Sequence, residues 1–141
     1  MTSAPVVPDL EAGQEQSIIL VVEDQIITRA AVAEELRDQG HKVVEAGTAD
    51  EALVILRAGI PVDVVLTDLE MPGSLKGNGL VRLIRAEFSW LRVVMFSGLP
   101  PEDDVRRLLD GYLAKPILPW ELVRYLRTLI PTPATRRDGD E

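Results

Sequence analysis

Hydrophobic residues along this chain alternate between short continuous runs and longer stretches with helical spacing. Residues 18–22 form a β-branched run, Ile-Ile-Leu-Val-Val, which is typical of a strand buried on both faces. Gly40 then stands where it can end a helix. The residues at helical spacing before it are Ile26, Ala30, Ala33 and Leu36. The pattern predicts a strand followed by a helix.

The same order of strand and helix recurs along the chain. We expect further strands at residues 42–46, 62–67, 92–96 and 112–114. We expect further helices between Thr48 and Gly59, around Leu80, Leu83 and Ile84, at residues 102–109 and at residues 119–130. Five strands alternating with five helices predict an α/β fold, in which a parallel sheet is covered by helices on both faces.

The sequence marks the start of one predicted helix more clearly than the start of the last one. Thr48 and Glu51 have the spacing of a capping box, which predicts a well-defined helix start. Leu118 stands where the last helix would have a polar cap, so its first N–H groups need water or another partner. In that helix we expect Trp120, Val123 and Leu126 on the buried side, although Leu118 and Trp120 can alternatively form an exposed apolar patch.

Length and composition favour one domain with a packed core, since the chain has 141 residues and 46% hydrophobic residues. Residues 1–16 and 131–141 lack apolar periodicity, and we expect both to be disordered tails. No stretch reaches the roughly 18 apolar residues of a membrane span, and the first residues do not resemble a signal peptide. We therefore expect a cytoplasmic protein without membrane contact.

Charge and residue usage exclude several kinds of site. The chain has no cysteine and one histidine, His41, which excludes thiolate chemistry and multi-histidine metal centres. A net charge of −8 opposes direct binding to nucleic acid, which needs a basic surface.

Acidic residues follow two of the predicted strands. Glu23 and Asp24 come after the first strand, and Asp68 comes after the third. In a parallel sheet, the carboxyl ends of the strands lie on one edge, so these carboxylates are expected to meet. Carboxylates at such short separations repel each other unless a proton or a metal ion neutralises them. The sequence thus predicts a cation site.

A glycine-rich segment, residues 73–79, follows Asp68 and leads into a helix. It lacks both the Gly-Lys-Ser/Thr ending and the Gly-x-Gly-x-x-Gly spacing of phosphate-binding loops. We interpret it as a turn beside the acidic residues, with Gly77 or Gly79 at the position that needs glycine.

Several motifs agree in order and spacing with one known family. Asp24 precedes Asp68 by 68 − 24 = 44 positions, and Met71-Pro72, Ser97-Gly98 and Lys115-Pro116 follow in turn. Residues 17–130 resemble the receiver domain of two-component response regulators. The resemblance implies a doubly wound, five-stranded parallel sheet of flavodoxin-like type with strand order 2-1-3-4-5. The interval from Ser97 to Lys115 is shorter than in common receivers, so we expect a short or displaced fourth helix.

The resemblance also implies the chemistry of the site. Asp68 would accept a phosphoryl group from phosphohistidine, with Mg²⁺ held by Asp24, Asp68, the backbone carbonyl of Glu70 and, partly through water, Glu23. Ser97 and Lys115 would contact the phosphoryl group, the Lys115-Pro116 peptide bond would be cis, and Ser97 and Tyr112 would form a switch. Phosphoryl transfer depends mainly on positioning and charge stabilisation, which suits these residues.

The implied partners are a sensor histidine kinase or a histidine phosphotransfer protein and a downstream protein target, and pairing with a second copy of the chain stays open. We expect a stand-alone phosphoprotein that is no enzyme beyond its own phosphorylation and dephosphorylation, although an excised piece of a longer regulator fits too. Two alternatives stay open: a receiver-like scaffold that works without phosphorylation, and a flavin- or nucleotide-binding module.

Overall fold

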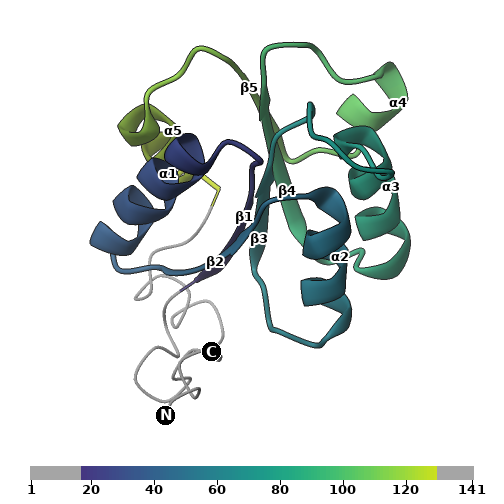
Figure 1. Cartoon of the computed structure of the whole chain (residues 1–141), viewed down its shortest axis with the longest axis horizontal. Coiled ribbons are helices and arrows are strands. Elements are labelled where there is room, and N and C mark those ends of the chain that lie inside the picture. The colour runs from purple at the N-terminus through teal and green to yellow at the C-terminus, as the bar shows by residue number, and fades with distance from the viewer. Residues whose placement is uncertain (1–16, 130–141) are drawn as a thin grey trace.

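Five parallel strands form one sheet in the order β2-β1-β3-β4-β5 (Figure 1). The computed structural model describes residues 17–129. The strands are β1 (Ile18–Val22), β2 (Lys42–Ala46), β3 (Val64–Thr67), β4 (Arg92–Ser97) and β5 (Gly111–Ala114). This order and the parallel pairing confirm the predicted flavodoxin-like fold.

Helices cover both faces of the sheet. They are α1 (Ile26–Asp38), α2 (Ala49–Arg57), α3 (Gly77–Glu87), α4 (Asp103–Arg106) and α5 (Pro119–Leu126). Helices α1 and α5 lie together on one face, and α2, α3 and α4 lie on the other (Figure 1). None of the helices between residues 17 and 129 has the length and apolar character needed to cross a bilayer.

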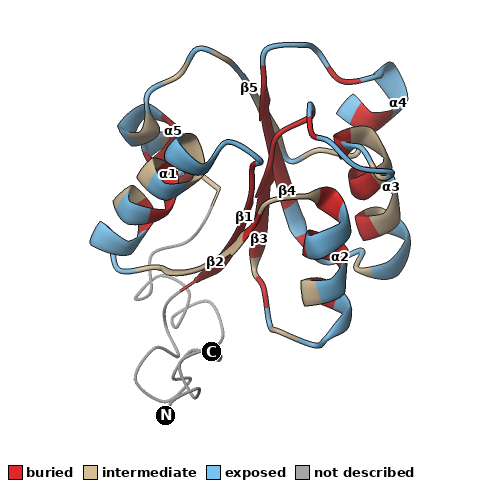
Figure 2. Ribbon diagram, in the orientation of Figure 1, coloured by how far each residue is buried: buried red, intermediate tan, exposed pale blue. Residues whose placement is uncertain are grey.

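Two hydrophobic clusters hold these layers together, one on each face of the sheet. Successive side chains of a strand point to opposite faces, so β1 contributes Ile19 and Val21 to one cluster and Leu20 and Val22 to the other. All five residues of β1 are buried, and the centre of the sheet is buried throughout (Figure 2). Burial on both faces explains why this strand has a continuous apolar run rather than an alternating one.

The strongest local signals in the sequence correspond to real boundaries. The Thr48 hydroxyl accepts a hydrogen bond from the Glu51 N–H at 3.0 Å and caps α2. The Glu51 carboxylate, however, accepts from the Gly47 N–H at 2.7 Å and not from the Thr48 N–H. Gly40 and Gly59 follow α1 and α2 with φ of 95° and 90°, a conformation in which other residues are strained.

The buried faces of α1 and α5 differ in part from the apolar spacing of the sequence. In α1 the buried residues are Val32, Ala33 and Leu36, whereas Ile26 is 69% exposed. The first turn of α1 begins at the rim of the sheet, so Ile26 has no strand to pack against. The buried position predicted for Trp120 is wrong, because α5 turns Leu122, Val123 and Leu126 toward the sheet. Trp120 is 48% exposed and Leu118 is 55% exposed, in agreement with the alternative of an exposed apolar patch.

The remaining differences concern the ends of elements. Helix α4 has four residues, which confirms the expected short fourth helix, although the predicted range, residues 102–109, extends beyond both of its ends. Without a polar side chain at position 118, the Glu121 N–H donates to the Leu118 carbonyl at 2.9 Å, and the Leu118 N–H donates to the Glu121 carboxylate at 3.0 Å. The predicted tails, residues 1–16 and 131–141, and the predicted last helical residue, Ile130, lie outside the described residues.

Candidate functional site

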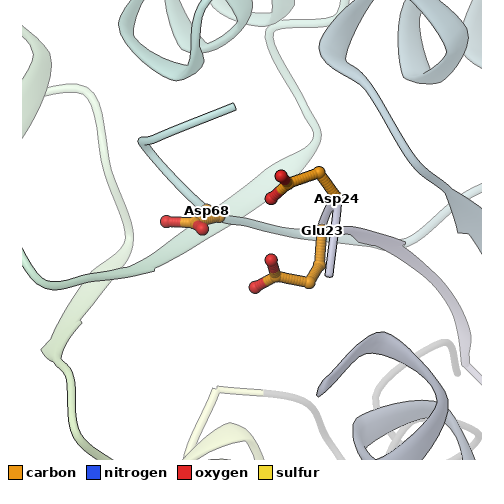
Figure 3. Close-up of side chains that lie close together, drawn as sticks. All are labelled: Glu23, Asp24 and Asp68. Carbon is orange, nitrogen blue, oxygen red and sulfur yellow. The ribbon is translucent and has the colours of Figure 1, made fainter. Parts of the chain in front are cut away.

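Three carboxylates meet at the edge of the sheet formed by the carboxyl ends of the strands. Glu23 and Asp24 follow β1, Asp68 follows β3, and one oxygen of each lies within 4.8 Å of the others (Figure 3). The cause is topological, since β1 and β3 are hydrogen-bonded neighbours that end together, with Val22 opposite Thr67. Residues 44 positions apart in the sequence thereby form one acidic cluster, as the sequence predicts.

Two of these carboxylates are withdrawn from solvent. Glu23 is fully buried and Asp68 is 3% exposed, whereas Asp24 is exposed. Backbone N–H groups support the buried pair: Gln25 donates to Glu23 Oε2 at 3.0 Å and Glu70 donates to Asp68 Oδ1 at 3.2 Å. Burial raises the pKa of the Glu23 carboxyl above its ordinary value, and the neighbouring Asp68 charge adds to this, against the lowering effect of the Gln25 N–H and Lys115.

Lys115 is the cation of the site. Its Nζ lies 3.1 Å from Glu23 Oε1 and 3.1 Å from Asp68 Oδ2, and it stands 5.0 Å from the centre of the Phe96 ring. The Lys115-Pro116 peptide bond after β5 is cis, which confirms that prediction. Burial lowers the pKa of Lys115, but its hydrogen bonds to Asp68 and Glu23 outweigh burial, so the pKa lies above its ordinary value.

The charges of this cluster do not balance. Three carboxylates face one ammonium group, which leaves 3 − 1 = 2 negative charges when all are ionised. The donors are all hard oxygen atoms, two of them at buried residues, and Mg²⁺ prefers oxygen ligands and few protein carboxylates. The donor set therefore fits a divalent cation such as Mg²⁺.

Ser97 and Tyr112, on neighbouring strands, share one neighbour, Leu99. Ser97 ends β4 and is fully buried, and its hydroxyl accepts a hydrogen bond from the Leu99 N–H at 3.1 Å. The Tyr112 hydroxyl donates to the Leu99 carbonyl at 3.3 Å, and the Arg106 guanidinium lies 5.2 Å from the centre of the Tyr112 ring. The Lys115 N–H also donates to the Ser97 carbonyl at 2.8 Å. These contacts connect the switch candidates to the acidic site.

Gly77 is the glycine on which the loop after Asp68 depends. A Cβ at Gly77 would lie 2.7 Å from the Asp68 carbonyl oxygen and 2.6 Å from Leu69 Cα, which no side chain can occupy. A Cβ at Gly79 would meet only the end of the Leu75 side chain. The sequence alone did not decide whether Gly77 or Gly79 is at the position that requires glycine. The close approach of the Asp68 and Leu69 backbone identifies Gly77.

The sequence analysis missed one residue at the site, Arg29. One terminal nitrogen of its guanidinium, Nη1, donates to the Glu23 carbonyl oxygen at 2.8 Å, and its Nε donates to Glu45 Oε1 at 3.2 Å. Side chains of a helix lean toward its amino terminus, so an arginine in the first turn of α1 reaches back over the loop after β1. This backward direction of helical side chains is the signal that could have identified Arg29 from the sequence.

A family model described as response regulator receiver domain matches residues 19–127. The chain belongs to this family. The matched range runs from β1 to the end of α5 and contains every predicted site residue of the receiver.

Curated relatives of this receiver are regulators of greater length. The transcriptional regulatory protein AruR of Pseudomonas aeruginosa is 32% identical over 122 residues, covering 79% of this chain and 48% of its own. The alkaline phosphatase synthesis transcriptional regulatory protein SphR of Synechococcus elongatus is 33% identical, covering 92% of this chain and 54% of its own. The chain therefore spans about half the length of these relatives.

Solved receivers have the same fold as this one. The chemotaxis response regulator CheY4 of Vibrio cholerae matches with a TM-score of 0.74 and 25% identity, over 82% of this chain and 99% of its own. TrrA of Thermotoga maritima, solved in complex with Mg(2+)-BeF, matches with a TM-score of 0.74 and 27% identity, over 82% of this chain and all of its own.

Proposed function

We propose that Asp68 of this receiver accepts a phosphoryl group from phosphohistidine in a Mg²⁺-dependent reaction of a two-component or phosphorelay system. The observation that carries the proposal is the contact of Lys115 Nζ with both Asp68 and Glu23 inside an acidic cluster at the carboxyl edge of the sheet. A carboxylate nucleophile needs positive charge beside it once a phosphoryl group arrives.

The cation would be held by Asp24 and Asp68, by the backbone carbonyl of Glu70 and, through water, by Glu23. When bound, Mg²⁺ neutralises the charge of the phosphoryl oxygens. The Mg²⁺-BeF complex of TrrA supports this assignment, because that relative has the same fold.

The residues of the chain have separate tasks in the proposed transfer. A carboxylate oxygen of Asp68 attacks phosphorus, an O–P bond forms, the N–P bond of the donor breaks, and its electron pair returns to the imidazole nitrogen. Lys115, already 3.1 Å from Asp68, stabilises the negative charge of the transferred group. The Ser97 hydroxyl donates a hydrogen bond to a phosphoryl oxygen. The domain thus promotes only its own phosphorylation and dephosphorylation.

Phosphorylation would act on the rest of the domain through Ser97 and Tyr112. In this structure both residues are hydrogen-bonded to the backbone of Leu99. If Ser97 turns toward the phosphoryl group, the Leu99 N–H loses its partner and the loop after β4 is free to rearrange. Tyr112 would then rotate inward, which changes the surface formed by α4, β5 and α5.

Protein partners would meet the rim of the sheet and this surface. Ile27 is 85% exposed and Leu118 is 55% exposed, and Ile27 lines a cleft of about 530 Å³ between α1 and the start of α5. Apolar exposure of this kind suits contact with another protein. The partners would be a sensor histidine kinase or histidine phosphotransfer protein and a downstream protein target. A cytoplasmic location and a homodimer stay predictions.

The alternatives are less well supported. A flavin or nucleotide module on this fold would bind phosphate after β1, where Glu23 and Asp24 would repel it. A receiver-like scaffold that needs no phosphorylation has no use for a buried Asp68 paired with Lys115.

Incubation with acetyl phosphate and Mg²⁺, followed by the intact mass, tests the proposal. We expect a gain of one phosphoryl group that disappears in Asp68→Asn and when Mg²⁺ is chelated. Asp38→Asn, at the exposed end of α1, is the control and should gain the same mass. A gain that persists in Asp68→Asn, or a wild-type mass that no phosphodonor changes, contradicts the proposal.

The switch is tested separately by ¹⁹F NMR of fluorotyrosine-labelled protein, with Tyr125→Phe used to assign the two tyrosine signals. Beryllofluoride with Mg²⁺ should shift the Tyr112 signal in the wild type, and the shift should be lost in Ser97→Ala. A Tyr112 signal that responds equally in both proteins would contradict coupling through Ser97.

A further inference from the structure

Arg29 occupies an unusual place for a charged residue of a surface helix. Its side chain is only 20% exposed, and it bridges α1, the loop after β1 and the end of β2. Ordering a long side chain and removing most of it from water is costly, so the contacts that it makes are expected to matter.

The backbone around the acidic pair is fixed from several directions, and Arg29 supplies the contact from a side chain of α1. The Glu23 N–H donates to the Ala46 carbonyl at 3.0 Å, and the Gln25 N–H donates to the Glu23 carboxylate at 3.0 Å. The Glu23 carbonyl accepts from Arg29 Nη1 at 2.8 Å. This carbonyl belongs to the peptide unit that leads into Asp24, so Arg29 restrains the backbone from which the exposed Asp24 side chain projects.

Arg29 is itself held in place by β2. Glu45 accepts from Arg29 Nε at 3.2 Å, and Gly47 leaves room for the guanidinium, because a Cβ at Gly47 would lie 3.2 Å from Arg29 Nη1. Glu45 also pairs with Arg37 at 3.3 Å. The guanidinium is thus a rigid fork between Glu45 and Glu23, which a lysine could not reproduce with a single nitrogen.

We propose that Arg29 is a positioning residue for the cation site, which orders the Glu23-Asp24 backbone and thereby increases the affinity for Mg²⁺. The inference rests on the proposed function, since it concerns the same cation. Residues that orient metal ligands without touching the metal typically change metal affinity by about 10–100-fold.

Simple electrostatics predicts the opposite sign. Arg29 brings a positive charge to an acidic cluster, so its removal would tighten cation binding if charge were its only effect. A positioning role predicts weaker binding when the fork is lost. The sign of the change in Mg²⁺ affinity therefore distinguishes the two roles.

The experiment is calorimetric titration of the full-length chain with Mg²⁺ for the wild type, Arg29→Met, Arg29→Lys and Arg37→Met. We expect about tenfold weaker binding in Arg29→Met and a smaller loss in Arg29→Lys, which keeps the charge but not the fork. Arg37→Met is the matched control, because Arg37 shares Glu45 with Arg29 but donates to the Val43 carbonyl instead of the Glu23 carbonyl. Its affinity should equal that of the wild type.

A second measurement separates positioning from general loss of structure. The Mg²⁺ concentration that gives half the maximal rate of phosphorylation by acetyl phosphate should rise about tenfold in Arg29→Met. The rate at saturating Mg²⁺ and the far-ultraviolet circular dichroism should not change. If Arg29→Met does not fold, Arg29→Gln, which keeps a polar side chain but has neither the charge nor the fork, replaces it with the same expected direction.

Unchanged or tighter Mg²⁺ binding in a folded Arg29→Met or Arg29→Gln variant overturns the inference. It would leave the proposed function intact, because the wild type would still bind Mg²⁺ and gain a phosphoryl group. Failure of the wild type to bind Mg²⁺ would instead overturn both.

Discussion

Two clusters of charged side chains in this domain each pair one cation with two carboxylates. The rim cluster consists of Lys115, Glu23 and Asp68, and the surface cluster, between α3 and α4, consists of Arg82, Glu102 and Asp104. Side chains of the rim cluster are 26%, 0% and 5% exposed, whereas those of the surface cluster are 43%, 61% and 57% exposed.

The comparison shows that the burial of an ion pair indicates function better than the types of residue that form it. Exposed pairs are screened by water and ions and contribute little to stability. Carboxylates that are buried beside each other interact strongly, and Asp24 adds a further negative charge to the rim cluster. Without a bound cation, this arrangement of charges destabilises the folded state. A site that binds a cation is expected to have this property.

Lys115→Met should have the largest effect on the rim cluster. It leaves Glu23 and Asp68 without their cation, and breaking a buried ion pair from one side costs about 3 kcal/mol or more. We expect a decrease of about 3 kcal/mol in the free energy of unfolding in urea at neutral pH without metal. The rate of phosphorylation by acetyl phosphate should fall about a hundredfold, as for the loss of one stabilising group. Wild-type stability in this variant would contradict the assignment of a strongly coupled cluster.

Gly77→Ala should come next, because the rim has no room for an added methyl group beside Asp68. The new Cβ would collide with backbone atoms of Asp68 and Leu69, and overpacking of this kind costs about 1–3 kcal/mol. Gly79→Ala is the matched control on the same helix. Its Cβ meets only the mobile end of Leu75, and alanine favours the helix, so the unfolding free energy should change little or increase. An equal decrease in unfolding free energy in both variants would show that close backbone packing at Gly77 is not the cause of the effect.

Glu23→Gln should change stability in the opposite direction. Burial raises the pKa of Glu23 in the folded protein, so the folded state holds this proton more tightly than the unfolded state does. Ionised Glu23 is therefore destabilising at pH values above its raised pKa, and this penalty disappears as the pH falls below the ordinary pKa of glutamate. Without metal, the variant should have a higher Tm than the wild type at pH 7, and the difference should shrink at pH 4.

The same variant should bind Mg²⁺ more weakly, since it lacks one of the three carboxylates. Adding Mg²⁺ should therefore raise the Tm of the wild type more than that of Glu23→Gln. A variant that is less stable than the wild type at pH 7, in the absence of metal, would mean that Glu23 stabilises the fold instead of serving the site.

Arg82→Met should have the smallest effect. Arg82 forms hydrogen bonds with Asp104 at 3.0 Å and 3.1 Å and contacts Glu102, but all three side chains remain in contact with solvent. We expect little change in unfolding by urea, and even less at high salt, where such pairs are screened. A loss as large as that of Lys115→Met would remove the distinction between the two clusters.

Much of this architecture could be predicted from the sequence. The continuous apolar runs identified the five strands, and the glycines after the helices marked where α1 and α2 end. Alternation of strands and helices then placed Glu23, Asp24 and Asp68 on one edge, although they are distant in the chain. These predictions succeeded because each concerns the path of the backbone. The spacing of apolar residues along the sequence indicates whether a segment forms a strand or a helix.

What could not be predicted depends on side-chain direction and on contacts between loops. Ile26 belongs to the apolar spacing of α1 and Trp120 to that of α5, yet both are exposed near helix starts that the sheet does not cover. The role of Gly77 needed the distance to the Asp68 backbone, and the contacts of Arg29 needed the position of Glu45 on a neighbouring strand. Periodicity contains none of this information.

The central claim is that Asp68 is the residue that receives phosphorus, and its most direct test locates the new bond. The protein is phosphorylated with acetyl phosphate and Mg²⁺, reduced with borohydride, which converts an aspartyl phosphate to homoserine, and analysed by peptide mass spectrometry. The account predicts homoserine at position 68 and at no other aspartate. Homoserine at Asp24 or at another aspartate, with position 68 unmodified, would contradict it.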